Sequence, residues 1–544
     1  MVDLLEVGEA ALADGDWVGA RAAFGELVGV DETADSLSGL ATAHWWLGDI
    51  RDAFSCWERA FAASAQADPV RAARVAVRLA VLYDANAGNP AVAKEWVARA
   101  VELSLILDDP VVTAWTLVAR GAAEEDPLQV AAWAERILRA GQDADDRDLQ
   151  LHGLSMWGSA LIDLGRVTEG AAMLDEALAG ALAAEPMNLD TVVFAGRMLM
   201  QSCVRGADFL RVVQWIRSLA DFMERYGCPY LHAICRSSYG AVLVATGDWV
   251  RAETELAAAG ELAGDSLPAV QAEVAAYLAD LRLAQGRVDE ARRLLAGYED
   301  RLVVRPILTA AHLAAGDTAT AVAMARRQLD NLEGRYIEES CLREVLGEAY
   351  LAGGDFGSAA DEGRHLATVG VRADSVLIKA RAERLLGRAL LAAGDNDAAQ
   401  DHLAAADAQY AWLEMPLEVA RTRLAQAVAM SAEQPESAVE EALVALTVFE
   451  DLGAARDADA AATWLESVGA TAGRKGPRGL GVLTKRERDV LGVLAEGLSN
   501  PEIAASLYLS RRTVEHHVAS VLSKLGLQNR TEAAAYVAHH LVEK

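Results

Sequence analysis

The sequence predicts an all-α protein: a long solenoid of helical hairpins followed by a small four-helix domain at the C-terminal end. Three observations support this fold class. A turn containing Gly recurs along residues 1–467, the chain is rich in Ala and has only 12 prolines, and residues 481–544 contain several helix-capping signals. Because the chain has 544 residues, it is too long for one hydrophobic core, which favours a repeat array and a separate domain.

The recurring turn places Gly first and a small residue five positions later. Gly ends a first helix in the left-handed conformation, and the small residue lets a second helix pack closely against it. A single hairpin cannot bury its apolar face, so neighbouring copies are expected to stack. The nine copies are Gly15/Ala20, Gly48/Ala53, Gly88/Ala93, Gly165/Gly170, Gly247/Ala252, Gly286/Ala291, Gly316/Ala321, Gly354/Ala359 and Gly394/Ala399.

Asp follows Gly in six of the nine copies, where its side chain is expected to cap the second helix. These residues are Asp16, Asp49, Asp248, Asp317, Asp355 and Asp395. Diverged copies are expected near Asp126-Pro127, Ala207-Asp208 and Gln434-Pro435. The array resembles tetratricopeptide repeats slightly longer than usual, over residues 1–467. That resemblance implies a surface for protein interaction or signal sensing.

The remainder of the chain divides into a linker and a C-terminal module. Residues 468–480 are rich in Gly and basic residues and lack apolar periodicity, which predicts a flexible linker. Capping signals and apolar spacing in residues 481–544, the C-terminal module, predict four helices. Their expected ranges are 484–496, 499–507, 510–525 and 530–542. Only two residues join the second helix to the third, which is the connection a helix-turn-helix needs.

The third predicted helix presents polar side chains suited to phosphates and base edges. They are Arg511, Arg512, Thr513, Glu515, His516, His517, Ser520 and Lys524. The module resembles the LuxR-type helix-turn-helix domain of bacterial transcription regulators. The matching motifs are L-T-x-R-E-x-x-V-L from Leu483, G-L-S-N-x-E-I-A from Gly497, L-S-x-R-T-V-x-x-H from Leu509, and K-L-G from Lys524.

The resemblance implies that the third helix enters the DNA major groove. Carried over position by position, Ser499 and Asn500 approach a phosphate. The residues that would face DNA are Ser510, Arg512, Thr513, Glu515, His516 and Ala519. Many family members have Lys where this chain has Glu515 and Ala519. Glu515 either accepts a hydrogen bond from cytosine or holds Arg511 or Arg512 in place, and both alternatives stay open.

Charge is distributed unevenly along the chain, whose net charge is −30. Residues 471–544 carry a net charge of +4, so the preceding 470 residues carry −34. DNA contact is therefore expected from the C-terminal module alone, in two copies on an inverted repeat. The acidic N-terminus does not resemble a secretory signal, no apolar run is long enough to span a membrane, and five scattered cysteines fit reduced thiols. We expect a cytoplasmic homodimer.

No nucleotide-binding loop, metal-ligand spacing or nucleophile–base set is present in the sequence, so we expect no cofactor, no metal and no enzyme activity. Ten of the twelve tryptophans precede residue 250. Repeat packing explains them best, and an aromatic-lined ligand or peptide site is the alternative. The region that departs most from the repeat contains the candidate ligand-binding residues Cys203, Trp215, Tyr226, Tyr230 and Cys235.

Together these features predict a bacterial transcription regulator in which the array senses a peptide, protein or small-molecule effector. Operator DNA is the expected partner of the C-terminal module, and RNA polymerase is a further candidate. The charge difference suggests that the acidic array covers the basic face around Arg511, Arg512 and Lys524 until an effector binds. The alternative is a protein-interaction scaffold with a weak or vestigial DNA-binding domain.

Overall fold

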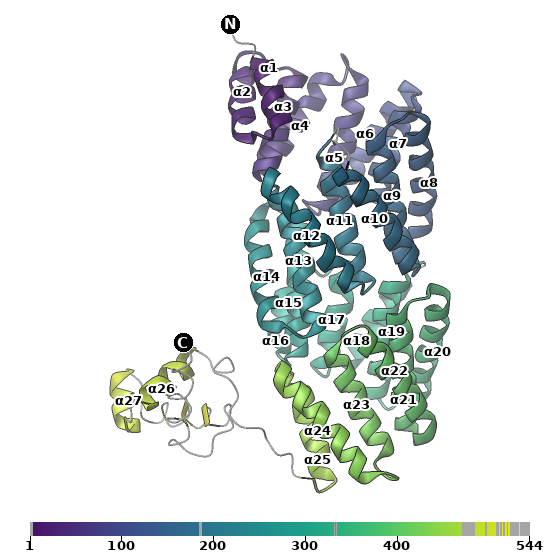
Figure 1. The fold of residues 1–544 in the computed structure, drawn as a ribbon, viewed down its shortest axis with the longest axis vertical. Helices are drawn as coiled ribbons and strands as arrows, with labels where there is room; N and C mark the ends of the chain where they lie inside the picture. Colours follow the sequence, from purple (N-terminus) through teal and green to yellow (C-terminus); the bar gives the residue numbers. More distant parts are fainter. Residues whose placement is uncertain are drawn as a thin grey trace. The chain divides into compact units, whose positions relative to one another are not determined.

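The structure of the protein is a computed structural model. It describes residues 4–183, 188–330, 332, 334–470, 485–495 and 498–507, together with residues 511, 514, 517, 518, 521, 522 and 533. The chain divides into two compact units, Met1–Ala461 and Ala462–Lys544. Within the described residues every regular element is an α-helix, apart from one 3-10 turn at Gly264–Ser266, so the predicted all-α class is confirmed (Figure 1).

The first unit is an array of helix pairs, twelve of them within the described residues. The first helices of the pairs are α1 (Leu4–Asp14), α3 (Ala34–Leu47), α5 (Pro69–Ala85), α7 (Pro110–Ala122), α9 (Arg147–Asp163), α11 (Asp190–Arg205), α13 (Pro229–Thr246), α15 (Pro268–Ala284), α17 (Val304–Ala314), α19 (Tyr336–Ala352), α21 (Val376–Ala393) and α23 (Pro416–Met430). The second helices are α2 (Trp17–Val30), α4 (Ile50–Ser64), α6 (Pro90–Leu107), α8 (Pro127–Asp143), α10 (Val167–Ala183), α12 (Phe209–Tyr226), α14 (Trp249–Ala263), α16 (Val288–Leu295), α18 (Thr318–Leu329), α20 (Phe356–Ala373), α22 (Asn396–Trp412) and α24 (Pro435–Leu452). A last helix, α25 (Ala455–Ser467), follows the twelfth pair.

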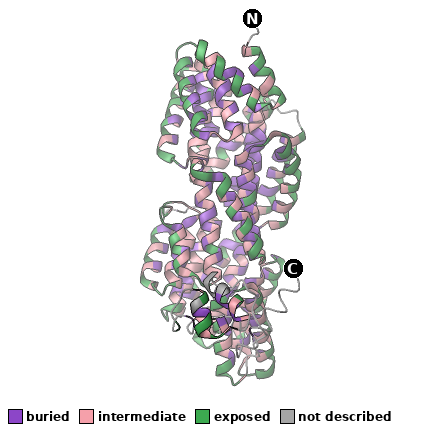
Figure 2. Ribbon diagram, turned by 90° about the vertical axis from the view of Figure 1, so that its left-hand side faces the viewer, coloured by how far each residue is buried: buried purple, intermediate pink, exposed green. Residues whose placement is uncertain are grey.

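First helices of successive pairs pack against one another along most of the array, and between α3 and α5 the link is an ion pair of Asp35 with Arg71, so these helices form an inner layer. Helices far apart in the sequence also meet in this layer, because α9 contacts α19 and α13 contacts α23. The buried residues follow the contacts between helices, and exposed residues lie on the outer helix faces (Figure 2). The inner layer is therefore where polar side chains become enclosed by protein.

The predicted Gly turns join the two helices in nine of the twelve pairs. Gly394, which ends α21, has φ of 88°, and its amide donates to the carbonyl of Leu391 at 3.1 Å. All nine predicted glycines have positive φ, as expected for left-handed helix ends. The eight alanines five positions later are fully buried. At Gly170 a Cβ atom would overlap the carbonyl oxygen of Gly158, so α9 and α10 approach even more closely than Ala allows.

The predicted Asp caps are confirmed at four of six positions. Asp16, Asp248, Asp355 and Asp395 each accept a hydrogen bond from a backbone amide three residues later. Asp49 does not cap its helix through the side chain, so the prediction is wrong there. At Asp317 no complete capping bond forms, but hydrogen bonding with Thr320, three residues later, lowers the pKa of its carboxyl group. Both carboxylates also contact an imidazole five residues earlier, as in the His44 Nδ1–Asp49 Oδ2 pair at 3.2 Å and the equivalent His312–Asp317 pair at 3.3 Å.

The three diverged copies are also confirmed as turns within helix pairs. They lie between α7 and α8, between α11 and α12, and between α23 and α24. Ala207 adopts φ of 59° in place of Gly, and Asp208 then caps α12 by accepting from the amide of Arg211 at 3.3 Å. Asp126 caps α8 in the same way through the amide of Leu128, at 2.9 Å.

All five cysteines are free thiols, as their scattered positions predict. Four of them are buried, and Cys341 is half-buried. Burial raises the pKa of Cys228 and Cys235 to about 12, so these thiols are protonated near neutral pH. Among the described residues, no helix combines the length and the apolar character that a bilayer crossing requires.

The second unit contains α26 (Lys485–Ala495) and α27 (Asn500–Ser506), which agree with the first two predicted helices of the C-terminal module. Residues 468–470 are described and the rest of the predicted linker lies outside the described residues. The boundary between the compact units falls within α25, at residues 461 and 462. The domain limits at 467 and 481 stay predictions.

Candidate functional site

The C-terminal module has a small apolar core. Val490, Leu491 and Leu494 of α26 are buried against Ile503 of α27. The described positions of the third predicted helix are all helical, and the buried ones join this core. They are residues 511, 514, 517, 518, 521 and 522, of which Val514 and Val521 are fully buried. The spacing of these residues places one face of the third helix against α26 and α27.

The start of α27 is held by an interaction between Ser499 and Glu502. The Ser499 amide donates to Glu502 Oε2 at 2.7 Å, and its hydroxyl donates to the same oxygen at 2.6 Å. This carboxylate occupies an amide that the first helical turn leaves without an intrahelical acceptor. Pro501 follows at a position where the missing N–H costs nothing. The second helix of the predicted helix-turn-helix is therefore fixed at its first turn.

Four of the predicted DNA-contacting residues are described. Ser499 and Arg511 are exposed, whereas Asn500 and His517 are half-buried. The other eight lie outside the described residues: Ser510, Arg512, Thr513, Glu515, His516, Ala519, Ser520 and Lys524. The exposed position of Arg511, one helical turn before the buried Val514, leaves its guanidinium group at the surface of the module.

Residues 481–537 match the family model described as bacterial regulatory proteins, luxR family. The C-terminal module is a luxR-family domain. The match agrees with the resemblance carried by the sequence motifs and with the helical positions in α26, α27 and the third helix. It covers only the module, so it carries no information about the array.

Curated relatives match short parts of the chain. The DNA-binding transcriptional activator DevR/DosR of Mycobacterium tuberculosis is 40% identical over 89 residues, which are 16% of this chain and 40% of that protein. The transcriptional regulatory protein YhcZ of Bacillus subtilis is 52% identical over 54 residues, or 10% of this chain and 25% of that protein. The response regulator protein VraR of Staphylococcus aureus is 44% identical over 59 residues, or 11% and 28%. The chain thus spans two fifths or less of the length of these relatives.

Solved structures resemble the array only distantly. Cut9 with Hcn1, from the APC/C hetero-tetramer, has a TM-score of 0.35 at 14% identity, covering 84% of this chain and 95% of that chain. Yeast Tom70 has a TM-score of 0.28 at 12% identity, covering 86% and 95%. These scores are too low to support an inference about the array.

The inner layer of the array contains a cavity of about 700 Å³, here called the aromatic cavity. It is bordered by α3, α5, α7, α9, α11 and α13, and by Trp57 of α4. Its walls include rings that pack on one another: Trp45 lies 5.6 Å from Tyr230, and His152 stacks on Phe194 at 4.3 Å. The edge of Trp115 completes this side, 4.9 Å from the His152 ring. The same aromatic side chains therefore pack between repeats and line the cavity.

Several polar atoms around the aromatic cavity have no hydrogen-bond partner among the described residues. Both side-chain atoms of Asn86, the Tyr230 hydroxyl, the Ser38 hydroxyl and Asp190 Oδ1 are in this state. Asn86 is 1% exposed and Tyr230 is 5% exposed. Buried polar groups in folded proteins are almost always bonded to protein, water or a ligand. Such atoms also occur elsewhere among the described residues, as at Gln328 and Tyr410, but five of them belong to residues that line this one cavity.

Charged residues at the aromatic cavity differ in how they are paired. Arg78 pairs with Asp190 at 2.7 Å and lies over the Trp57 ring at 5.0 Å. Arg197 donates to Gln201 Oε1 at 3.1 Å and lies over Phe194, and no carboxylate of the described residues is within ion-pair distance. Arg74 is exposed and has no hydrogen-bond or ion-pair partner among the described residues.

His152 is an uncharged member of the cavity wall. Its Nδ1 donates to the carbonyl oxygen of Asp148 at 2.8 Å, which leaves Nε2 as an acceptor. Burial lowers the pKa of His152 to about 4, because a positively charged ring in this enclosed position would not be hydrated. The imidazole is therefore neutral near pH 7.

The predicted ligand-binding residues do not line one common cavity. Tyr230 lines the aromatic cavity, whereas Cys203 and Cys235 are enclosed in the hydrophobic core. Trp215 lies in a separate depression between α10 and α12, where its Nε1 donates to Asp175 at 2.6 Å. Tyr226 packs on Phe222 and Trp46. The cavity residues that the sequence did not single out are Ser38, Asn86, Arg74, Arg197 and His152, and only the excess of tryptophans before residue 250 pointed toward this part of the array.

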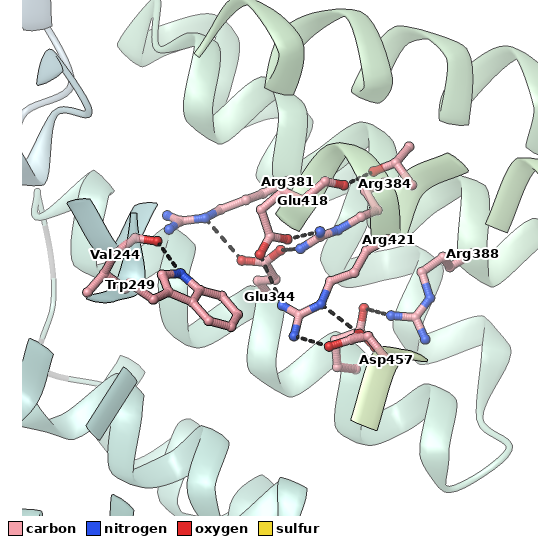
Figure 3. Close-up of polar contacts among 11 residues, drawn as sticks. Val244, Trp249, Glu344, Arg381, Arg384, Arg388, Glu418, Arg421 and Asp457 are labelled. Carbon is pink, nitrogen blue, oxygen red and sulfur yellow. Dashed lines mark hydrogen bonds and ion pairs between the residues drawn. The ribbon is translucent and has the colours of Figure 1, made fainter. Parts of the chain in front are cut away.

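Further along the inner layer, charged side chains pair with one another in a group here called the charge cluster (Figure 3). Its members are Glu344, Arg381, Arg384, Glu418, Arg421 and Asp457. Arg421 binds both oxygens of Asp457 at 2.9 Å, and Arg384 reaches Glu344 at 2.6 Å and also pairs with Glu418. Burial alone would raise the pKa of Glu418, but the guanidinium groups of Arg384 and Arg421 outweigh it and lower the pKa to about 2.

Proposed function

We propose that the protein is a bacterial transcription regulator that binds operator DNA through its C-terminal module. The supporting observation is the luxR-family match over residues 481–537, together with α26, α27 and a third helix that buries one face and carries the exposed Arg511 on another. The transcriptional roles printed in the names of the curated relatives agree with this proposal. RNA polymerase is the partner expected at a promoter.

DNA recognition in this proposal uses the third helix in the major groove. Arg512 and Thr513 supply donors for phosphate and base edges, and Ser499 and Asn500 approach a phosphate at the start of α27. A homodimer binding an inverted repeat doubles the contact, which suits a segment, residues 471–544, whose net charge is only +4. The array, with a net charge of −34 over the first 470 residues, takes the effector rather than DNA.

Genome-wide DNA occupancy of the tagged full chain tests this function. We expect sharp promoter peaks for the wild type and their loss in the double variant Arg512→Ala/Thr513→Ala. The matched control is Arg364→Ala/Thr368→Ala, which removes the same residue types from an exposed face of α20. Peaks should persist in this control. Absence of peaks for the wild type in cells that contain the protein would favour the scaffold alternative.

The proposal includes masking of the module by the acidic array. A fragment of residues 471–544 should then bind the operator more tightly than the full chain, compared per protomer at equal oligomeric state. Equal or weaker binding by the fragment would contradict masking and leave the DNA-binding function intact.

A further inference from the structure

We propose that the aromatic cavity is the effector site, and that its ligand is a small acidic molecule with a flat aromatic or conjugated body. This inference rests on the proposed function for the role of the ligand as an effector. Binding itself depends only on the array. The cavity volume of about 700 Å³ falls within the range of small-molecule sites.

The unpaired polar atoms are the first argument for a ligand. Asn86, at the end of α5, presents an amide donor and a carbonyl acceptor that lack partners among the described residues, although the residue is 1% exposed. Tyr230 of α13 and Ser38 of α3 add hydroxyl groups in the same state. Leaving such groups unpaired destabilises a fold. Because each of these atoms is enclosed by protein, a bound molecule satisfies them only where the neighbouring side chains shift to admit it.

The walls define the shape of the ligand. Trp45, Trp57, Trp115 and Phe194 line the cavity from four different helices. Their rings provide extended flat apolar faces, and rings of a ligand pack on such faces by stacking or edge contacts. A flexible aliphatic chain would use this geometry less well. The aromatic walls therefore favour a planar apolar body.

The charges define the polar end of the ligand. Three aspartates at the cavity have partners: Asp146 caps α9, Asp148 accepts from Thr191 at 2.7 Å, and Asp190 pairs with Arg78 through one of its two carboxylate oxygens. Arg74 and Arg197, in contrast, form no ion pair among the described residues, and the charge of Arg197 only partly opposes the burial that raises the pKa of Asp84 and Glu273. At the rim, the exposed Asp145 and Arg147 offset each other in charge. The available guanidinium groups favour an anionic group such as a carboxylate.

Arg197 is the residue best placed to select the anion. It is half-buried on α11, its guanidinium group lies over the Phe194 ring at 5.6 Å, and its present acceptors are Gln201 Oε1 and Met198 Sδ. A carboxylate is a stronger acceptor than either of these neutral groups. The Phe194 ring would then contact the aromatic body while the guanidinium group binds the acid.

Isothermal titration calorimetry on the full chain, without DNA, tests the site. The probes are 2-naphthoate, indole-3-acetate and the neutral 2-naphthylmethanol. We expect one saturable site per chain for both anions, with dissociation constants in the millimolar range or below for molecules of this size. The affinity for 2-naphthoate should exceed that for 2-naphthylmethanol by about tenfold, the effect of one charge-assisted bidentate contact.

Arg197→Gln should abolish the preference for the anion, whereas Arg99→Gln should retain it. Arg99 is the matched control, because its guanidinium group also lies over an aromatic ring, Trp96, at 4.4 Å but outside the cavity. A second variant, Ser38→Phe, places a ring within the cavity and should remove binding of all three probes. Far-UV circular dichroism and thermal unfolding confirm that each variant is folded.

Three results would overturn the proposal: no saturable binding of either anion at millimolar concentration, equal affinity for the neutral probe, or binding that survives Ser38→Phe in a folded protein. The outcome is independent of operator binding, because the assay contains no DNA. Conversely, the occupancy experiment requires no probe, so a failure of the proposed function and a failure of this site give different results.

Discussion

The aromatic cavity and the charge cluster both place polar side chains in the inner layer of the array, yet they satisfy them differently. Around the cavity, polar atoms of Ser38, Asn86, Asp190 and Tyr230 have no partner among the described residues. In the charge cluster, three arginines face three carboxylates, and none of the six side chains contains a buried atom without a partner in the part of the chain that the structure describes.

This difference separates polar residues that stabilise the fold from polar residues that surround a candidate binding site. A network in which every member is paired fixes the helices relative to one another, and removing one member is costly. The unpaired donors and acceptors around the aromatic cavity, by contrast, lower the stability of the array without fixing helices relative to one another. The charge cluster therefore holds α19, α21, α23 and α25 together, whereas the aromatic cavity is the site of the proposed ligand.

The largest expected effect comes from breaking the charge cluster. Glu418→Ala leaves Arg384 and Arg421 with one carboxylate fewer, and the local free energy of unfolding of α23 should fall by about 3 kcal/mol. Native-state hydrogen exchange in α23 measures this change. Asp361→Ala breaks an exposed pair with Arg364 and should cost less than about 0.5 kcal/mol. Equal effects of the two substitutions would show that the cluster is not a cooperative network.

The pH dependence of the cavity wall gives the next effect. The pKa of His152 is about 4 in the folded state against an ordinary value of 6.5, so the unfolded chain takes up the proton first as the pH falls. The contribution of neutral His152 is complete above pH 6.5 and is lost toward pH 4, by about 3 kcal/mol at most. His152→Phe should remove this part of the acid sensitivity.

Urea unfolding followed by tryptophan fluorescence measures the effect, because ten of the twelve tryptophans lie before residue 250. The free energy of unfolding of the variant is subtracted from that of the wild type, once at pH 7 and once at pH 4. The contributions of the other titrating groups cancel in each subtraction. His365→Phe, at an exposed position, is the control. An unchanged difference between the two pH values would mean that His152 is not enclosed by the cavity wall.

The smallest expected effect has the opposite sign. Asn86→Leu removes two polar atoms that lack partners, so the variant should be more stable than the wild type by about 1 kcal/mol while binding 2-naphthoate more weakly. Asn89→Leu, three residues away, removes a side chain that caps α6 and should instead destabilise by about 1 kcal/mol. Hydrogen exchange in α5 and α6 measures both. A destabilised Asn86→Leu variant would show that this amide is satisfied in solution.

The sequence predicted the helix pairs because Gly and Ala at fixed spacing act locally. Gly394 and Ala399 determine one turn without information from distant residues, and all nine such turns are present. In the same way, Ser499 and Glu502 predicted the start of α27 from four residues. The diverged turn near Ala207-Asp208 was harder to predict, because Ala207 replaces Gly at a left-handed position.

The cavity and the charge cluster could not be predicted in this way, since both depend on residues far apart in the sequence. Asn86 looks like an ordinary helix end, and its burial depends on distant segments such as α15, whose Ala269 amide donates to the Asn86 carbonyl oxygen at 3.2 Å. Glu344, Glu418 and Asp457 come from three helices that meet only in the folded array. The candidate residues Cys203 and Cys235 were selected because their region departs from the repeat pattern. In the structure both side chains belong to the hydrophobic core and do not line the aromatic cavity.

Hydrogen–deuterium exchange of the full chain with and without saturating 2-naphthoate tests the division between these two regions most directly. Protection confined to segments of α3, α5 and α11, with no change in α21 and α23, is the predicted result. Protection in α21 and α23, or none anywhere in the array while the probe is bound, would contradict it.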